Sequence, residues 1–196
     1  MQPEPAYEPP SGDPDESGAR LAAEEGRLRL LVVHLAGRAV RARVPAEDLV
    51  QEVFLRAVTA PGGLPPREPG EQALRRFLAR LARNAVVDAA RAIRAARRDG
   101  RTEPLARSDW SRAGTSRLAD RAPGPSTHAQ GRELAEALAS AFEGLSPEHR
   151  RVLGLRQLEG LSAAEAARRM GRSETAVHSL YRRALAAWQG ALEGTR

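Results

Sequence analysis

Polar side chains that could read DNA follow Gly171 in a stretch with helical spacing. Hydroxyl, carboxylate and imidazole groups can pair with base edges in the major groove, and arginine grips phosphate as a rigid fork. Two arginines one turn further along would contact the sugar–phosphate backbone. The alternative is a helical hairpin that only packs against other protein. The candidate DNA-binding residues are Arg172, Ser173, Glu174, Thr175, His178, Ser179, Arg182 and Arg183.

A second group of candidates lies within residues 75–107, where arginines far outnumber acids. Arginines clustered along one helix are the electrostatic footprint of a nucleic-acid-binding surface. The ordinary alternative, a solvated helix face, would interleave acids with the arginines, whereas Asp88 stands nearly alone. We therefore predict DNA contact by a basic ridge, defined as Arg76, Arg80, Arg83, Arg91, Arg94, Arg97 and Arg98.

Residues 46–58 show a different chemistry, in which acids and amides gather on the face predicted to point away from the core. This face carries Glu47, Asp48, Gln51, Glu52 and Leu55. A leucine exposed among carboxylates indicates a contact with another protein. The alternative is that a single exposed leucine has no function.

No catalytic residue, metal site, cofactor or small-molecule substrate is predicted. The sequence has no Cys, and its four His are scattered without metal-ligand spacing. It shows neither paired carboxylates, a nucleophile constellation nor a Gly-rich phosphate loop. No apolar run approaches the roughly 20 residues of a membrane span. The N-terminus lacks the features of a signal peptide, and a cytoplasmic location is therefore expected.

Composition predicts an all-α fold of small helical domains. Of the 196 residues, 41% are hydrophobic but only 4% are aromatic, so each core must be built from Leu, Val and Ala. The formal net charge is +6, and all 31 basic residues are Arg. The absence of Lys has two readings, the grip of Arg on phosphate or codon usage in a GC-rich genome. Codon usage does not explain where the arginines lie.

The chain is predicted to divide into a tail, two domains and a linker. Residues 1–26 are acidic and Pro-rich, which indicates a disordered tail. Residues 99–131 lose all periodicity and read as a flexible linker. Such a coil spans about 30–35 Å and more when extended, so it could place two domains two or three turns apart on DNA, at about 34 Å per turn. The domains themselves occupy residues 27–98 and 132–193.

The first domain is predicted to hold three or four helices around one core. An apolar stripe marks the first helix, and Pro45 suits the first turn of the next, whose apolar face runs from Leu49 to Val58. The Pro- and Gly-rich run of residues 61–70 ends that helix. A long third helix is expected over residues 71–98.

The second domain is predicted to end in a helix-turn-helix over residues 161–183. Ser162 and Glu165 form an S-x-x-E capping box at the start of a short helix, and Gly171 suits its left-handed end. Ser173 caps the following helix. Two helices joined by such a turn can lay the second in the major groove. The core side of that second helix is predicted to consist of Val177, Leu180 or Tyr181, and Ala184.

Three stretches of the sequence resemble bacterial sigma factors. Residues 46–58 (AEDLVQEVFLRAV) and 74–98 resemble region two, and residues 145–185 look like region four. With only these two regions and a short linker, the chain resembles the extracytoplasmic-function group. The resemblance implies a transcription initiation factor that binds core RNA polymerase and promoter DNA. It also implies an anti-sigma factor as a candidate partner.

The resemblance implies roles for individual residues. Asp48, Leu49, Gln51, Glu52 and Leu55 would grip the clamp helices of the polymerase β′ subunit, and the β flap would be a second polymerase contact. The upstream promoter element, the minus-thirty-five box, would be read by the helix-turn-helix. The downstream element, the minus-ten box, would be bound and opened by Phe77, Arg80, Arg83, Asn84, Asp88, Arg91 and Arg94. Alternatively, Asn84 and Asp88 could simply hydrogen-bond to neighbouring backbone.

The chain departs from the family pattern at several positions. Phe77 stands where Trp is frequent, and the loop of residues 61–70 has no aromatic residue. Stacking of an unpaired base must then come from Phe77 or from Arg planes. His178 and Leu180 stand where basic residues are common, which predicts fewer or different contacts with the upstream element.

The predicted function is therefore promoter-specific transcription initiation, with two alternatives left open. A stand-alone repressor or activator would use only the helix-turn-helix and would need no acidic surface around residues 48–55. An Arg-rich RNA-binding or ribosome-associated protein is the other alternative. The capped major-groove hairpin favours DNA over RNA.

Overall fold

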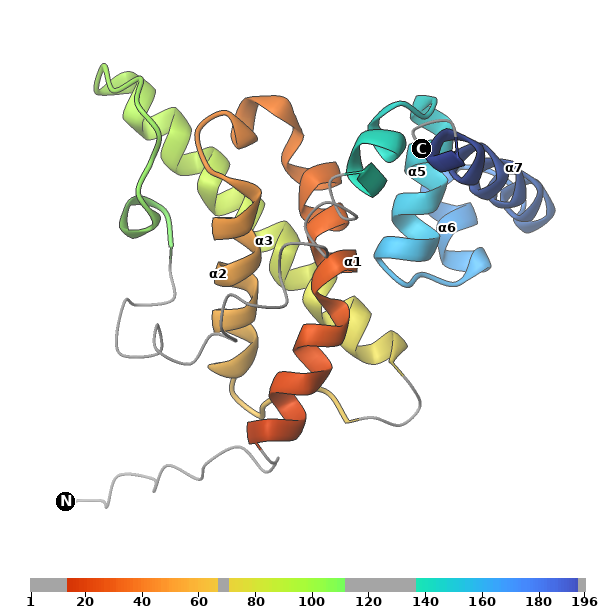
Figure 1. Ribbon diagram of the computed structural model, residues 1–196, viewed down its shortest axis with the longest axis horizontal. Coiled ribbons are helices and arrows are strands. Elements are labelled where there is room, and N and C mark those ends of the chain that lie inside the picture. The colour runs from red at the N-terminus through yellow and green to blue at the C-terminus, as the bar shows by residue number, and fades with distance from the viewer. Residues whose placement is uncertain (1–13, 67–70, 112–136, 194–196) are drawn as a thin grey trace.

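The apolar stripes of the sequence fold into two neighbouring groups of helices (Figure 1). The computed structural model describes residues 14–66, 71–111 and 137–193. Every regular element in these ranges is helical, which confirms the predicted all-α class. None of the described helices is both long and apolar enough to cross a membrane.

The first group is a bundle of three helices, α1 (Pro14–Arg41), α2 (Ala46–Val58) and α3 (Gln72–Arg98). Leucines and valines from each helix meet in its core, and small alanines on α3, such as Ala82 and Ala85, let the helices approach closely. Val58, which was predicted to face this core, is instead 41% exposed because α2 ends there.

The helix α1 begins at Pro14, so the prediction of a disordered tail up to residue 26 is wrong for residues 14–26. Leu21 and Glu24 are both buried. Arg20 Nη2 donates to the carbonyl of Pro65 at 2.9 Å, which joins this first part of α1 to the loop after α2. Residues 1–13 of the predicted tail lie outside the described residues.

The predicted linker also begins later than expected, because residues 99–111 pack on the bundle. Arg43 donates through Nε to the carbonyl of Glu103 at 2.7 Å and through Nη2 to that of Arg101 at 3.1 Å. Leu105 and Trp110 are buried on either side of the short turn η1 (Arg107–Asp109). Leu105 and Trp110 stand among polar and small residues, so the sequence pattern did not predict that they pack on the bundle. The rest of the predicted linker, residues 112–131, lies outside the described residues.

The second group begins with helical residues 137–143 and continues through α5 (Pro147–Leu153), the π-helical turn η4 (Gly154–Leu158), α6 (Ala163–Met170) and α7 (Glu174–Glu193). Ser146 caps α5 by accepting from the His149 amide at 3.3 Å. Among the described residues Phe142 is the largest fully buried side chain, and Trp188 meets its ring edge-on at 5.6 Å between centroids.

The two groups of helices pack directly on each other through α1 and η4. The His34 ring lies edge-on to Phe142 at 5.4 Å. It fits against Gly154 because that residue has no side chain, and a Cβ built there would lie 2.6 Å from His34 Nε2. Sequence periodicity predicts separate cores, whereas the buried residues of both groups form one continuous apolar cluster.

The position of His34 makes the stability of this packing dependent on pH. Burial is the main reason that the pKa of the His34 imidazole is lowered; attraction to Glu159 partly offsets this, and repulsion from Arg150 and Arg83 adds to it. The neutral ring is therefore favoured in the folded state. Its contribution to stability is present above an unfolded-state pKa of about 6.5 and is lost as the pH falls through the lower folded-state value.

We expect the urea concentration at the midpoint of unfolding to decrease when the pH is lowered from 7.5 to 5.5. The decrease should be smaller in a His34→Leu variant. The comparison isolates the imidazole because every carboxylate is common to both proteins. An identical pH dependence of the two midpoints would contradict this role for His34.

Candidate nucleic-acid and protein interfaces

The turn between α6 and α7 has the local geometry that the sequence predicts. The Glu165 amide donates to Ser162 Oγ at 3.2 Å, and the Ser162 amide donates to Glu165 Oε2 at 2.7 Å, which completes the capping box. Gly171 ends α6 in the left-handed conformation, with φ 64°. Ser173 Oγ accepts from the Ala176 amide at 3.2 Å at the start of α7. These caps fix the entry angle of α7.

The helix α7 has one buried and one exposed face. Val177, Leu180 and Ala184 are buried, so Leu180 belongs to the core and its identity does not bear on DNA contact, contrary to the sequence-based prediction. Arg172 forms an ion pair with Glu148. The predicted DNA-contacting residues are all exposed on the outer face: Arg172, Ser173, Glu174, Thr175, His178, Ser179, Arg182 and Arg183.

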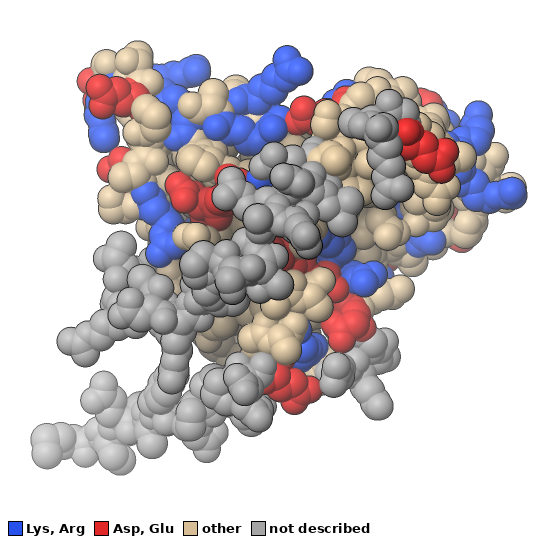
Figure 2. Space-filling view, in the orientation of Figure 1, with Lys and Arg blue, Asp and Glu red and all other residues tan. Residues whose placement is uncertain are grey.

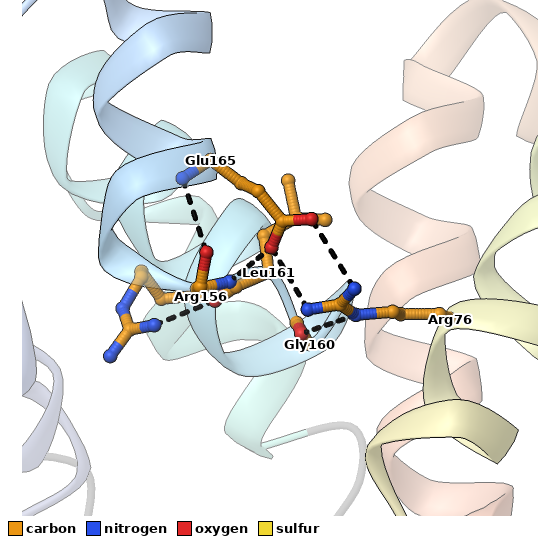
Figure 3. Close-up of polar contacts among 6 residues, drawn as sticks. Arg76, Arg156, Gly160, Leu161 and Glu165 are labelled. Carbon is orange, nitrogen blue, oxygen red and sulfur yellow. Dashed lines mark hydrogen bonds and ion pairs between the residues drawn. The ribbon is translucent and has the colours of Figure 1, made fainter.

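The basic ridge on α3 divides into two parts. Arg80, Arg91 and Arg94 are exposed, and the Arg80 guanidinium lies 5.6 Å from the centre of the Phe77 ring. Figure 2 shows basic side chains along the upper edge of the molecule, over the last turns of α3 and the end of α1, and at the far right over α7. Arg76 and Arg83, whose side chains are both 43% exposed, are paired with carboxylates of the second group of helices; Figure 3 shows Arg76 with its partner Glu165.

Asp88 does not lie on the exposed surface as the DNA-contact prediction requires, because it is 9% exposed and paired. Its Oδ2 lies 3.0 Å from Arg56 Nη1, and its Oδ1 lies 3.8 Å from Arg91 Nη1. The exposed amide of Asn84 lies one turn earlier on α3. Together these residues and Val87 line a surface pocket between the end of α2 and the middle of α3.

Glu52 was predicted to face outward and is fully buried. Its Oε1 accepts from Arg56 Nε at 2.7 Å, and its Oε2 accepts from the Ser111 hydroxyl. The segment that follows α3 therefore covers part of the face that was predicted to be open. Leu49 is also fully buried and contributes to the core.

The exposed part of this face of α2 is consequently smaller than predicted. Gln51 is exposed, and Asp48 and Leu55 are half-buried. Partial burial is the main reason that the pKa of the Asp48 carboxyl is raised, with a smaller opposing effect of Arg107. Asp48, Gln51 and Leu55 are the residues of the predicted polymerase-binding set that keep accessible surface on α2.

Arg56 is the functional-site residue that sequence analysis missed. It joins Glu52 on its own helix to Asp88 on α3, and its side chain is only 13% exposed. The i, i+4 spacing from Glu52 is a sequence signal for a pair on one helix. The pairing of Arg56 with Asp88 could not be detected from the sequence, since Asp88 lies on another helix.

Comparisons with known proteins agree with this two-part arrangement. Residues 26–98 match the family model described as Sigma-70 region 2, and residues 135–187 match that described as Sigma-70, region 4. The two matches together cover more than half of the chain. No curated protein matches the chain.

Replacing Arg56 by Met should destabilise the protein by about 3–5 kcal/mol, because it removes the cation that the two buried carboxylates Glu52 and Asp88 share. The measurement is the free energy of unfolding in urea at pH 7. Arg91→Met is the matched control. Its side chain is 65% exposed and its pair with Asp88 is long, so we expect a loss of at most about 1 kcal/mol. Equal losses in the two variants would contradict a structural role for Arg56.

Proposed function

Because the chain belongs to the sigma-70 family, with a region 2 followed by a region 4, we propose that it is a sigma factor of the extracytoplasmic-function group. In this role it binds core RNA polymerase, directs it to a promoter and helps to open the DNA. The observation that carries the proposal is the presence of both regions in this order, with only about 36 residues between the two matches. The short connection supports the extracytoplasmic-function group in particular.

Recognition of the upstream element is proposed for α7. The two caps and the Gly171 turn present its first two turns outward, and all its candidate side chains are exposed. In this proposal Arg172, Thr175 and His178 contact base edges, and Arg182 and Arg183 contact phosphates. Region 4 would also contact the β flap of the polymerase.

Binding of the downstream element is proposed for α3. Unstacking a base costs a few kcal/mol, and basic surfaces with stacking planes recover this cost. Phe77 and the guanidinium of Arg80 next to it supply such planes. Asn84, Arg91 and Arg94 supply exposed donors further along the same helix. Asp88 is proposed to act by holding Arg56 and Arg91 at the pocket.

Polymerase binding is proposed for the accessible part of α2. Asp48, Gln51 and Leu55 combine charge, amide and apolar contact on one side, which suits a helical partner such as the β′ clamp helices. Glu52 and Leu49 are assigned instead to holding α2 in place. An anti-sigma factor remains a predicted partner. The proposed role places the protein in the cytoplasm with the polymerase.

The purified chain with core polymerase should produce promoter-specific transcripts from a library of genomic fragments, whereas core polymerase alone should not. A stand-alone regulator would bind DNA through region 4 but would give no such transcripts. Absence of specific transcripts across the library would overturn the sigma-factor proposal.

Introducing Arg at both Gln51 and Leu55 should weaken binding to core polymerase about tenfold or more, as for an interface residue worth about 1–2 kcal/mol. Binding is measured by competition with a labelled wild-type chain. Val58→Arg, at the exposed end of the same helix, is the control. Retained affinity in the double variant would exclude this face of α2 from the polymerase interface.

Replacing Arg182 and Arg183 by Gln should reduce the salt dependence of duplex DNA binding by about one unit of slope for each phosphate that is no longer neutralised. His178→Ala should instead change which duplex sequences are preferred. Selection from a random duplex library, followed by salt titration, separates the two effects. An unchanged slope in the double variant would argue against phosphate binding by these arginines.

A further inference from the structure

The residues that follow α3 form a strap, defined as residues 99–111, which lies against the first group of helices. Gly100 takes the left-handed conformation, with φ 75°, and the Arg101 amide donates to the Ala96 carbonyl at 2.8 Å, so the chain reverses direction at the end of α3. In Figure 1 it then runs back beside α2. The strap lies outside both stretches that match the sigma-70 family models, residues 26–98 and 135–187. Membership of the family therefore assigns it no role.

Buried contacts fix the strap at several points along its length. The Leu105 amide donates to the Arg43 carbonyl at 2.9 Å. The Arg43 side chain in turn donates to the carbonyls of Glu103 and Arg101, and Arg43 is only 8% exposed. Leu105 and Trp110 are each 4% exposed and belong to the apolar core. Removing the strap would expose both apolar side chains and would take two acceptors from a buried guanidinium. The strap is therefore a lasting part of this group of helices rather than a removable cover.

The turn η1 within the strap lies next to the first two turns of α2. The Ala106 amide donates to Asp109 Oδ2 at 3.0 Å, which closes η1. Directly after η1, the Ser111 hydroxyl donates to the buried carboxylate of Glu52. This bond joins the end of the strap to the helix that carries Asp48, Gln51 and Leu55.

Arg107 brings a positive charge to the acidic end of α2. Burial is the main reason that the pKa of the Asp48 carboxyl is raised, and the charge of Arg107 opposes this shift, so the two groups act on each other. Arg107 is half-buried, and Ser108 and Asp109 next to it are exposed. Within the described part of the chain no carboxylate forms an ion pair with Arg107. The turn η1 thus places an accessible cation beside an acidic side chain that is proposed to contact the polymerase.

We propose that η1 is a second element of the polymerase-binding surface and that Arg107 contacts the partner beside α2. The inference rests on the proposed function, because the partner is the one proposed for Asp48, Gln51 and Leu55. Continuity with that face identifies the occupant, since the strap bonds to Glu52 on the same helix. The mixed charge selects a partner that presents a carboxylate toward Arg107 and a basic or amide group toward Asp48.

Trp110 is a positioning residue in this arrangement. Its ring is buried in the core directly after η1, so it cannot touch the partner itself. Its amide donates to the Arg107 carbonyl at 3.2 Å, which connects the buried anchor to the turn. The helix α2 packs through its own apolar residues, Leu49 and Val53. Loss of the ring should therefore release η1 and leave α2 formed.

The first test replaces Arg107 by Glu in the full chain. Affinity for core polymerase is measured without DNA, by competition with the labelled wild-type chain. We expect binding to weaken about tenfold, because like charges would then face each other, and Arg107→Gln should weaken it less. The loss should shrink as salt is added, since the contact is close to solvent. Arg38→Glu is the matched control, because it makes the same charge change at an exposed position on α1. It should stay within about twofold of wild type.

The second test separates positioning by Trp110 from a general loss of stability. Trp110→Ala should weaken binding to core polymerase, and Trp110→Phe, which keeps an apolar ring, should retain most of it. In the Trp110→Ala background, Arg107→Glu should cause a smaller loss than in the wild-type chain, because η1 is no longer held beside α2. A merely structural role of Trp110 would leave the effect of Arg107→Glu undiminished.

The docking of the strap can be followed by fluorescence. The chain has two tryptophans, so Trp188→Phe leaves Trp110 as the single emitter. Arg107→Glu in this background should keep the blue-shifted emission of a buried ring. A red shift would assign the loss of affinity to undocking of the strap and would overturn Arg107 as a contact residue.

Wild-type affinity in Arg107→Glu, or an equal loss in Arg38→Glu, would overturn the extended surface. Tighter binding by Trp110→Ala than by the wild-type chain would also overturn it, because the strap would then act as a cover of the polymerase-binding face. Failure of the proposed function gives a different result. A wild-type chain that does not bind core polymerase removes both proposals. A chain that binds and gives transcripts regardless of Arg107 keeps the proposed function and removes only the role of η1.

Discussion

Glu24, Glu52, Asp88 and Glu159 are the carboxylates buried in the described part of the chain, and arginine pairs with each of them. A buried carboxylate without a cation would cost several kcal/mol, so each one dictates where an arginine must lie. Glu24 draws Arg75 of α3 to α1, and Arg56 links Glu52 to Asp88. With few aromatic side chains available, these pairs set the relative positions of helices whose cores are mainly leucine, valine and alanine.

Arginine therefore has two separate roles in this protein. Some guanidiniums hold the fold together: Arg56 pairs with Glu52, and Arg43 donates to a backbone carbonyl. Others remain exposed at the surface, as Arg80, Arg94 and Arg182 do. A net charge or a run of arginines does not distinguish the two groups. The useful quantity for nucleic-acid binding is the number of guanidiniums left without a carboxylate, and on α3 these lie mainly beyond the first half of the helix.

The same pairing connects the surfaces proposed for different partners. Glu52 lies beneath the face of α2 proposed for polymerase, and through Arg56 it reaches Asp88 at the pocket on the side of α3 proposed for DNA. Ser111 ties the segment after α3 to the same carboxylate. Ser111, Glu52, Arg56 and Asp88 thus form one continuous chain of polar contacts, in which both carboxylates are buried.

The helices after residue 26, the caps of α6 and α7 and the outward face of α7 could be derived from the sequence alone. Apolar repeats at three and four residues, the Ser162 and Glu165 pair and the glycine at position 171 all act over one or two turns, so the information is local. The identification of both sigma regions was likewise carried by contiguous motifs, such as AEDLVQEVFLRAV.

The burial of Glu52, the anchoring of residues 99–111 and the contact between regions 2 and 4 were decided only by the tertiary structure. Ser111 lies 59 residues from Glu52, and Glu165 lies 89 residues from Arg76. Periodicity within one helix shows that such a residue is polar and off the core stripe, but not whether another segment will cover it. Charged side chains have the same spacing along a helix whether their face is open to solvent or is covered by another segment. Only the packing of distant helices determines which carboxylates meet an arginine and which arginines stay available for DNA.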